Sequence, residues 1–493
     1  MKILFLASEV TPFSKTGGLA DVAGALPASL ARLGHEVTVV TPYYAYVRDR
    51  RIHSLDLQVR LKFPFGEEVG SLYEAQLEPR CRVLFIRHAG YFGRPGLYQE
   101  NGVDYPDNDR RFAFFTVAAL AAAERLDFIP QIVHLNDWQT GLGSLALRRG
   151  YRDTALRDAR SLFTIHNLAY QGNFPRGTLQ SLGLARSDFT IEGLEFHDRV
   201  SFMKAGLVYS DAITTVSRRY AQEIQTADYG FGMDGVLRSV VDRLHGVLNG
   251  VDYGEWDPAH DPHLPRPFGP DDLLGKAASK ALLLQRFGLG GDGEDRPLFG
   301  VVSRLAHQKG LDLLLAVAPD LLERGASLVL LGNGDGGLED GFRQLAVQHP
   351  GRVGVRIGFD LPLSHLIEAG SDFFLMPSRF EPSGLNQMYS LRYGAIPIVR
   401  ATGGLDDTVE GLGSPAANGI KFREFTPEAL LEAIESALGI YAQPKRLESL
   451  RRRGMRCDFS WDASARQYEA IYRSIAVPPG EETPLPRTVV RGP

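Results

Sequence analysis

The sequence predicts an α/β protein made of two doubly wound domains in tandem. A chain of 493 residues is longer than one hydrophobic core usually serves, so two or more domains are expected. Strand-like and helix-like apolar segments alternate from residue 2 and again from residue 298. Residues 257–272 lie between the two series, are rich in proline and show almost no apolar periodicity, which indicates a domain boundary.

The first series begins with a strand over 2–8, a loop, and a helix over 19–33 in which Pro27 is expected to introduce a kink. Gly34 ends this helix, and a strand over 36–40 completes a βαβ unit. Further elements are expected as strands over 83–87, 132–135 and 161–165 and as an Ala-rich helix over 111–125.

The second series predicts the same architecture. Its strands are expected over 298–302, 327–331, 353–357, 373–377 and 396–399, and its helices over 310–322, 338–348, 385–393, 427–438 and 445–456. We therefore predict Rossmann-like domains over 1–256 and 257–477, with the last helix a candidate for packing back on the first domain. The proline-containing segment 478–493 is expected to be a disordered tail.

The bulk composition argues against several classes of protein. Lys and Arg total 54 against 59 Asp and Glu, a net charge of −5, so a nucleic-acid partner is not expected. The two cysteines, Cys81 and Cys457, lack metal-ligand spacing, so we expect no disulfide and a cytoplasmic protein. The apolar run 3–7 is too short for a signal peptide, and no run approaches the roughly 18 residues of a membrane span, so no membrane partner is expected.

Charged residues follow two strands of the second series. The segment after the strand at 373–377 carries Arg379 and Glu381 and leads into a helix, which places both at the edge of the sheet where ligands bind. Alone, this pair would be read as a local ion pair that holds the loop. Arg304 and Lys309 share the loop after the strand at 298–302, so both are able to reach one point at that edge.

A four-residue motif, Thr-Gly-Gly-Leu, occurs once in each predicted domain, over 16–19 and 402–405. Paired glycines at a helix N-terminus expose backbone N–H groups that hold anions, although each copy alone is as well explained by a plain turn. Lys15 precedes the first copy and is either a solvated loop lysine or a phosphate contact. Together with Arg304 and Lys309 it would supply three positive charges, each worth roughly 4 kcal/mol at about 4 Å and a dielectric of about 20, before desolvation.

Polar residues also follow strands of the first domain. His166 and Asn167 come after the strand at 161–165, and Asp137 follows the strand at 132–135. A lone histidine is more often structural, and Asp137 could simply cap the next helix.

A glycine-rich segment over 332–337 fits G-x-G-x-x-G, with Asp360 roughly 20 residues on, as in a dinucleotide site. A nicotinamide-dependent dehydrogenase is therefore an alternative. The segment follows the second strand of its domain rather than the first, so we interpret it as a glycine-rich turn.

With these motifs assembled, the chain resembles the bacterial glycogen synthases and plant starch synthases, retaining glycosyltransferases of the GT-B fold. The resemblance extends from residue 1 to about residue 475. It is carried by Lys15–Leu19, His166–Leu168, Asn249–Asp252, Ser303–Arg304 with Gln308–Gly310, Ser378–Pro382 and Thr402–Leu405. It implies transfer of glucose from a nucleotide sugar to the non-reducing end of an α-1,4-glucan such as glycogen, with retention of configuration and without a metal or other cofactor.

The roles of individual residues follow from the resemblance, motif by motif. Arg304 and Lys309 would hold the diphosphate, and Lys15 would help to neutralise the leaving group. His166 would bind the glucose and place its backbone carbonyl near the developing oxocarbenium ion, and Glu381 would hold hydroxyl groups of the donor sugar.

The remaining site residues are also implied by the family. Asp21 would meet the ribose, and Phe359, where relatives often have tyrosine, would stack on the base. Backbone N–H groups for phosphate or sugar would come from Gly18, Thr402, Gly403, Gly404 and Leu405. The glucose and acceptor side would be completed by Tyr98, Asp137, Asn167 and Asn249.

The sequence departs from the family pattern beside the site. Ser383 stands where cysteine is frequent, Asn386 where threonine is frequent, and Gln139 where histidine is sometimes found. Where many GT-B retaining enzymes carry a second glutamate, this chain has Tyr389, as the bacterial synthases do. A front-face mechanism is therefore preferred over a double displacement with Glu381 as nucleophile.

The leading hypothesis is an ADP-glucose-dependent α-1,4-glucan synthase. The alternatives are a related enzyme that uses UDP-glucose or makes sucrose- or trehalose-type products, and a catalytically silent glucan-binding module. Closure of the two domains is expected because each would supply part of the site, with Glu381 across a cleft from Lys15 and His166.

Overall fold

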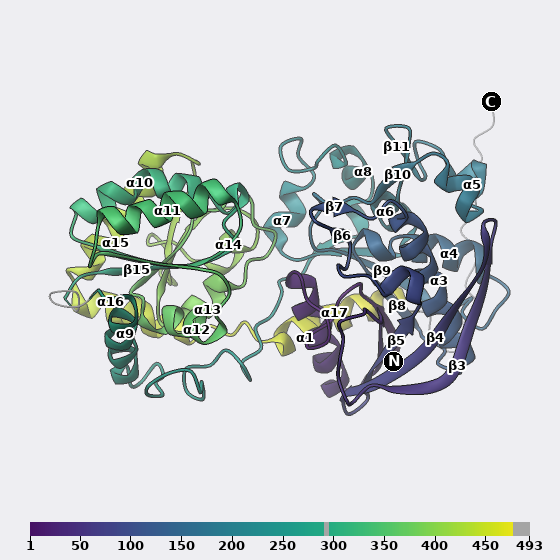
Figure 1. Ribbon diagram of the computed structural model, residues 1–493, viewed down its shortest axis with the longest axis horizontal. Coiled ribbons are helices and arrows are strands. Elements are labelled where there is room, and N and C mark those ends of the chain that lie inside the picture. The colour runs from purple at the N-terminus through teal and green to yellow at the C-terminus, as the bar shows by residue number, and fades with distance from the viewer. Residues whose placement is uncertain (290–294, 477–493) are drawn as a thin grey trace. The chain divides into compact units, whose positions relative to one another are not determined.

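The computed structural model describes residues 1–289 and 295–476, and it divides the chain into two compact units. Of the described residues, unit 1 comprises Met1–Thr215, Ile224–Val247 and those from Ser464 onward, and unit 2 comprises Val216–Glu223 and those within Leu248–Ala463 (Figure 1). The expected tail over 478–493 lies outside the described residues. None of the described helices is long and apolar enough to cross a membrane.

Unit 1 is built on one nine-stranded sheet. In spatial order its strands are β14 (Leu244–Gly246), β13 (Ala212–Thr215), β9 (Arg160–Ile165), β8 (Ile132–Asn136), β1 (Lys2–Leu6), β2 (Glu36–Pro42), β5 (Cys81–Arg87), β4 (Gly66–Glu78) and β3 (His53–Phe63). The strands from β14 to β5 are parallel, and β4 and β3 continue the sheet as an antiparallel ribbon. The chain leaves β1 in one direction toward β2 and returns on its other side at β8, so the topological switch lies between β1 and β8.

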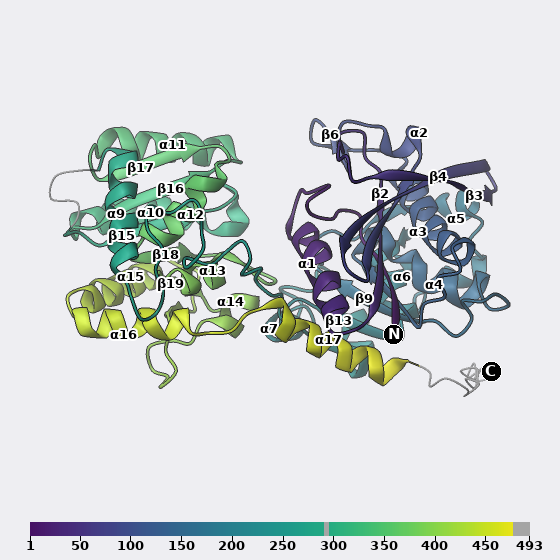
Figure 2. The same ribbon diagram turned by 90° about the horizontal axis from the view of Figure 1, so that it is seen from below.

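The principal helices of unit 1 are α1 (Gly18–Arg32), α3 (Asn108–Arg125), α4 (Leu142–Gly150), α6 (Phe202–Tyr209) and α17 (Trp461–Ile475). Shorter helices are α2 (Ala89–Phe92), α5 (Thr178–Leu182) and α8 (Asp234–Ser239). Pro27 lies inside α1, which continues to Arg32. The C-terminal helix α17 packs on this unit (Figure 2). There the Tyr472 hydroxyl lies 2.7 Å from His134 Nδ1 on β8.

Unit 2 is built on a six-stranded, fully parallel sheet. In spatial order its strands are β17 (Val353–Ile357), β16 (Ser327–Gly332), β15 (Leu298–Val302), β18 (Phe373–Met376), β19 (Ile396–Arg400) and β20 (Ile420–Phe422). This is the doubly wound order in which the winding reverses between β15 and β18. Most residues of these strands are apolar and buried, as expected for a parallel sheet covered on both faces, except in the edge strand β17, where only Val353 and Gly354 are buried.

Helices cover both faces of the unit 2 sheet (Figure 1). They are α9 (Leu274–Phe287), α10 (Leu311–Glu323), α11 (Gly336–Gln348), α12 (Leu361–Gly370), α13 (Asn386–Arg392), α14 (Gly403–Thr408), α15 (Pro427–Tyr441) and α16 (Pro444–Met455). The short α7 (Arg218–Glu223) also belongs to unit 2 and contacts α14. One core cluster joins α10, α11 and α15 to the sheet, and a second joins α9 and α12 to it. Because the helices cover the two faces of the sheet, its carboxyl edge is formed by the loops that follow the strands.

The alternation predicted from the sequence is present, and each predicted strand and helix has a counterpart. The β3–β4 ribbon was not predicted, because much of it is exposed and its apolar alternation is weak. The chain passes from unit 1 to unit 2 at Leu248, before the proline-rich segment 257–272 that was expected to mark the domain boundary. That segment is irregular chain within unit 2. Residues 216–223 group with unit 2 although their sequence neighbours group with unit 1, which local patterns do not reveal.

Candidate functional site

Several candidate residues of each unit lie at or beside its topological switch point. In unit 1 these are in the loops after β1, β8 and β9, and in unit 2 they are in the loops after β15 and β18. The others lie elsewhere: Tyr98 lies between α2 and β6, Asn249 follows β14, Phe359 follows β17, and Thr402–Leu405 follow β19. Ligands of open α/β sheets bind at switch points because the loops diverge there and leave a crevice at the carboxyl edge. Each unit therefore presents its own group of site residues.

The glycine loop of unit 1 is held by Glu9, a residue that the sequence analysis did not single out. The Glu9 carboxylate accepts hydrogen bonds from the backbone N–H of Thr16, from the Thr16 hydroxyl at 3.0 Å and from the Gly17 N–H at 3.3 Å. Burial raises the pKa of Glu9, and these donors act against that shift. The signal in the sequence was an acidic residue just after the first buried strand.

Lys15 and Asp21 form an ion pair beside this loop, with 2.6 Å between Lys15 Nζ and Asp21 Oδ1. The Lys15 side chain is 55% exposed, so it can turn toward a ligand at little cost. Burial raises the pKa of Asp21, while Lys15 lowers it. A Cβ added to Gly18 would meet no described atom within 4 Å, so the space over this glycine is open.

Tyr98 lies against the same loop. Its hydroxyl is 2.7 Å from the Ser8 hydroxyl, and the Tyr44 hydroxyl donates to the Ser8 carbonyl at 2.7 Å. Burial raises the pKa of Tyr98 well above its usual value, so the phenol stays protonated and able to donate. The tyrosine thus belongs to the hydrogen-bonded frame of the β1 loop.

Asp137 organises the loop after β9. Its Oδ1 accepts the backbone N–H groups of His166 at 2.7 Å and Asn167 at 3.4 Å. The residue has φ 55° and ψ −178°, a conformation that costs a non-glycine residue about 1–3 kcal/mol. The alternative that Asp137 caps the following helix is wrong, because no side-chain cap bond is present there.

His166 is held as a neutral imidazole. Burial lowers its pKa to about 3, and its Nε2 lies 2.9 Å from Asn136 Oδ1. Because the Asn136 amide nitrogen donates to the Leu6 carbonyl, its oxygen must accept, so His166 Nε2 carries the proton. This leaves Nδ1 as an acceptor, a group suited to a sugar hydroxyl.

Asp137 should make stability depend on pH in the direction opposite to most carboxylates. Burial raises its pKa to about 7, so the folded protein holds a proton that the unfolded chain has lost above pH 4. Its contribution to the free energy of unfolding therefore falls as pH rises from about 4 to about 7, by a few kcal/mol at most. We expect the unfolding temperature of the parent protein to fall relative to that of Asp137→Asn as the pH rises from 5 to 8. Parallel unfolding temperatures across this range would contradict the assignment.

In unit 2, Lys309 and Glu381 form a largely buried ion pair. Lys309 Nζ lies 2.6 Å from Glu381 Oε2, which also accepts the Ser378 hydroxyl at 3.1 Å. Their side chains are 21% and 7% exposed. The alternative of a local pair between Arg379 and Glu381 is wrong, because Arg379 instead pairs with Asp312 at 2.7 Å.

Arg304 lies at the end of β15 with an exposed side chain, in the loop that also carries Lys309. The glycine-rich segment over 332–337 packs its backbone against this loop, where the Leu305 N–H donates to the Asn333 carbonyl at 2.8 Å. A Cβ at Gly332 would lie 1.9 Å from the Ser303 carbonyl oxygen, so glycine is required for this close approach. Asp335 and Asp360 serve as N-caps of α11 and α12.

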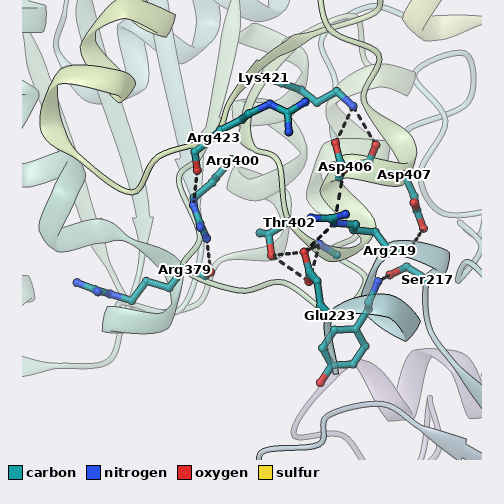
Figure 3. A network of polar contacts seen from close by, with 12 residues as sticks. Ser217, Arg219, Glu223, Arg379, Arg400, Thr402, Asp406, Asp407, Lys421 and Arg423 are labelled. Carbon is teal, nitrogen blue, oxygen red and sulfur yellow. Dashed lines mark hydrogen bonds and ion pairs between the residues drawn. The ribbon is translucent and has the colours of Figure 1, made fainter. Parts of the chain in front are cut away.

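The second glycine loop, over 402–405, has protein partners at each backbone N–H. Thr402 N–H donates to the Arg400 carbonyl, Gly404 N–H to the Glu381 and Pro382 carbonyls, and Leu405 N–H to the Thr402 carbonyl. The Gly403 N–H is held by Glu223, again a glutamate that the sequence analysis did not single out (Figure 3). Anion binding by this loop stays a prediction.

A cavity of about 380 Å³ lies beside the carboxyl end of β17. It is lined by Arg343 and by the segment from Val355 to Asp360, which includes Phe359. The Phe359 side chain is 88% exposed. An exposed ring beside a cavity is suited to stacking on a flat ligand.

Residues that differ from the family pattern have structural partners here. Tyr389 stacks on Trp256 with ring centroids 3.9 Å apart, so this position contributes packing rather than a second carboxylate. Asn386 donates to the Val302 carbonyl at 2.6 Å, and Ser383 donates to the Gly384 carbonyl at 3.3 Å. Gln139 is buried, and its Oε1 has no partner among the described residues.

Asn249 belongs to unit 2 and is 6% exposed. Its Oδ1 has no hydrogen-bond partner within the described parts of the chain. A buried acceptor without a partner is costly, so Asn249 is a good candidate to bind a ligand hydroxyl.

Comparisons with known proteins match both units. The family described as "Starch synthase catalytic domain" matches residues 2–239, and "Glycosyl transferases group 1" matches residues 290–454. A glycogen synthase from Myxococcus xanthus is 57% identical over 96% of this chain and 99% of its own length, and one from Koribacter versatilis is 46% identical over 96% and 98%.

Solved structures agree with these matches. The catalytic domain of starch synthase IV from Arabidopsis thaliana, bound to ADP and acarbose, has a TM-score of 0.89 and 34% identity over 96% of this chain and 99% of that one. Sucrose-phosphate synthase from Thermosynechococcus elongatus, 19% identical with a TM-score of 0.58 over 96% and 98%, shares the fold. The dehydrogenase alternative is therefore wrong.

Proposed function

The chain belongs to the glycogen and starch synthase family of GT-B glycosyltransferases, and on that premise we propose that it transfers glucose from ADP-glucose to the non-reducing end of an α-1,4-glucan, with retention of configuration. The observation that carries the proposal is the Lys309–Glu381 pair at the switch point of unit 2. It combines a cation for a diphosphate with a carboxylate for sugar hydroxyls. A nucleotide-sugar donor presents both a diphosphate and sugar hydroxyls.

The donor's diphosphate would be held by cations rather than by a metal. Lys309 is partly buried beside Glu381, and Arg304 extends from the same loop. The exposed Lys15 side chain would break its ion pair with Asp21 and turn toward the departing diphosphate, whose charge it would help to neutralise. Cations aimed at the leaving group lower the barrier because charge builds up there in the transition state.

The base of the donor would stack on Phe359 in the cavity beside β17. That the base is adenine is supported by the ADP bound to the Arabidopsis starch synthase. Aromatic faces stack on any base, so the preference for ADP over UDP would depend on polar contacts at the cavity rim. Arg343 is a candidate for such contacts.

The reaction would proceed on one face of the sugar. The bond between the anomeric carbon and the diphosphate oxygen breaks, and the acceptor hydroxyl oxygen bonds to the same face of that carbon, which retains its configuration. The hydroxyl proton passes to the departing phosphate oxygen. Glu381 would accept hydrogen bonds from hydroxyl groups of the donor sugar, and His166 Nδ1 would accept one from a sugar hydroxyl. Further contacts to the sugar would come from Tyr98, Asn167 and Asn249.

The state of the two cysteines supports a cytoplasmic location. Cys81 and Cys457 are free thiols, which is consistent with a reducing cytosol, and we place the enzyme there.

The proposal is tested by measuring ADP release from ADP-glucose with and without glycogen. We expect ADP release and chain extension only when both substrates are present, at the same rate in EDTA, with UDP-glucose a poor donor. Faster turnover of UDP-glucose, or of fructose or glucose phosphate acceptors, would favour the alternative enzymes. Binding of glycogen without turnover of either donor would indicate a silent glucan-binding module.

A further inference from the structure

Glu223 binds the glycine loop of unit 2 from a helix that is distant in sequence. Its two carboxylate oxygens lie 3.2 Å from the Thr402 hydroxyl oxygen and 3.1 and 3.2 Å from the Gly403 nitrogen (Figure 3). The Glu223 side chain is only 6% exposed. A carboxylate that accepts a backbone N–H and a hydroxyl in a buried place makes a strong contact.

The contact is one half of a reciprocal arrangement between α7 and α14. At the other end of the helix pair, Asp407 on α14 accepts the Arg219 N–H of α7 at 3.0 Å. Asp406 is held by Lys421 at 2.8 Å, and Arg219 Nε lies 3.2 Å from Glu223. Each helix therefore supplies a carboxylate to the first turn of the other.

The glycine loop in turn supports the loop of Glu381. The Gly404 N–H donates to the Glu381 carbonyl at 3.1 Å. A Cβ on Gly403 would lie 1.9 Å from that same carbonyl oxygen, and one on Gly404 would lie 1.9 Å from the Ser383 carbonyl oxygen. The backbones are in direct contact, so a displacement of Gly403 would displace Glu381 and its partner Lys309.

The path of the chain is consistent with a dedicated role for α7. Residues up to Thr215 and from Ile224 group with unit 1, whereas Val216–Glu223 groups with unit 2. The chain thus leaves unit 1 for eight residues, and the last of them is Glu223. Unit 1 holds its own glycine loop in the same way, through Glu9.

We propose that Glu223 is a positioning residue for the donor site: it holds the loop over Thr402–Gly404 against the loop of Glu381 and so fixes Glu381 and Lys309 for the donor. The inference rests on the proposed function of those two residues. Glu223 acts through the loop and does not itself meet the sugar. A different role, in which the Glu223 carboxylate occupies the loop until the donor's phosphate displaces it, predicts the opposite sign of effect on binding.

The test compares Glu223→Gln and Glu223→Ala with Asp407→Asn as the matched control. Asp407→Asn removes a carboxylate from the other end of the same helix pair but leaves the Gly403 contact intact. We expect the Glu223 variants to weaken ADP binding in calorimetry and raise the KM for ADP-glucose about tenfold or more, with the glycogen KM unchanged. Asp407→Asn should lower the unfolding temperature comparably yet keep the donor KM within about twofold.

Three outcomes would overturn the inference. They are tighter ADP binding by the Glu223 variants, equal losses of donor affinity in Asp407→Asn, and unchanged donor KM in Glu223→Ala. Glu223→Gln preserves the shape of the side chain and serves if the alanine variant does not fold. Absence of transfer by the parent protein would instead reject the proposed function, so the two failures are distinguishable.

Discussion

Lys309→Ala is expected to lower the rate of glucosyl transfer at least 100-fold, a loss of about 2.7 kcal/mol of transition-state stabilisation. Lys309 Nζ lies 2.6 Å from Glu381 Oε2 in a largely buried pair. Its removal takes away a cation for the diphosphate and leaves the Glu381 carboxylate without its partner. The measurement is the steady-state rate of ADP release with glycogen, together with the unfolding temperature.

The control for this variant is Arg379→Ala, which removes another cation from the Glu381 loop. Arg379 is about half exposed and pairs with Asp312, so we expect its loss to change the rate only a few-fold. Lys309→Arg keeps a positive charge and should retain an intermediate rate, even if the alanine variant is destabilised. A rate for Lys309→Ala within a few-fold of the parent would remove Lys309 from the site.

Glu381→Gln is expected to lower the rate by roughly 10–100-fold, mainly through weaker donor binding. A hydrogen bond to a charged group contributes about 1.5–3 kcal/mol, and the amide retains one acceptor for sugar hydroxyls. The Ser378 hydroxyl, 3.1 Å from Glu381 Oε2, would still find an oxygen there. Both kcat and the KM for ADP-glucose should be measured.

Substitutions of Glu381 also separate two mechanisms. If Glu381 were a nucleophile, its replacement would cost on the order of 10⁴-fold or more, by analogy with other covalent enzymes. Glu381→Ala would then regain activity with azide, which would attack the anomeric carbon in place of the carboxylate. We expect no rescue, because Tyr389 stacks on Trp256 where a second carboxylate would be needed. Azide-dependent turnover would contradict the front-face mechanism.

A common device supports both glycine loops. In unit 1 the Glu9 carboxylate binds Thr16 and Gly17, and in unit 2 the Glu223 carboxylate binds Thr402 and Gly403. In both copies of the Thr-Gly-Gly-Leu motif, a carboxylate of the same chain therefore binds the threonine and the first glycine. The space over Gly18 remains open to a ligand.

The sequence predicted the two doubly wound domains because its signals are local. Apolar runs, helical spacing and glycine or proline breaks are read within a few residues, and they located the loops of Lys309, Glu381, Asp137 and His166 at the carboxyl edges of strands. The family resemblance rested on these same loops. By contrast, the β3–β4 ribbon was missed because its exposed faces leave little apolar pattern.

The partners of the charged residues were decided only by tertiary structure. Arg379 and Glu381 are two residues apart, yet each pairs with a residue in the β15 loop or the helix after it, 67 and 72 positions away, because β15 and β18 are neighbours in the sheet. Glu223 reaches Gly403 across 180 positions, because α7 leaves unit 1 for unit 2. Strand order and chain path determine which side chains meet, and neither is encoded in local periodicity.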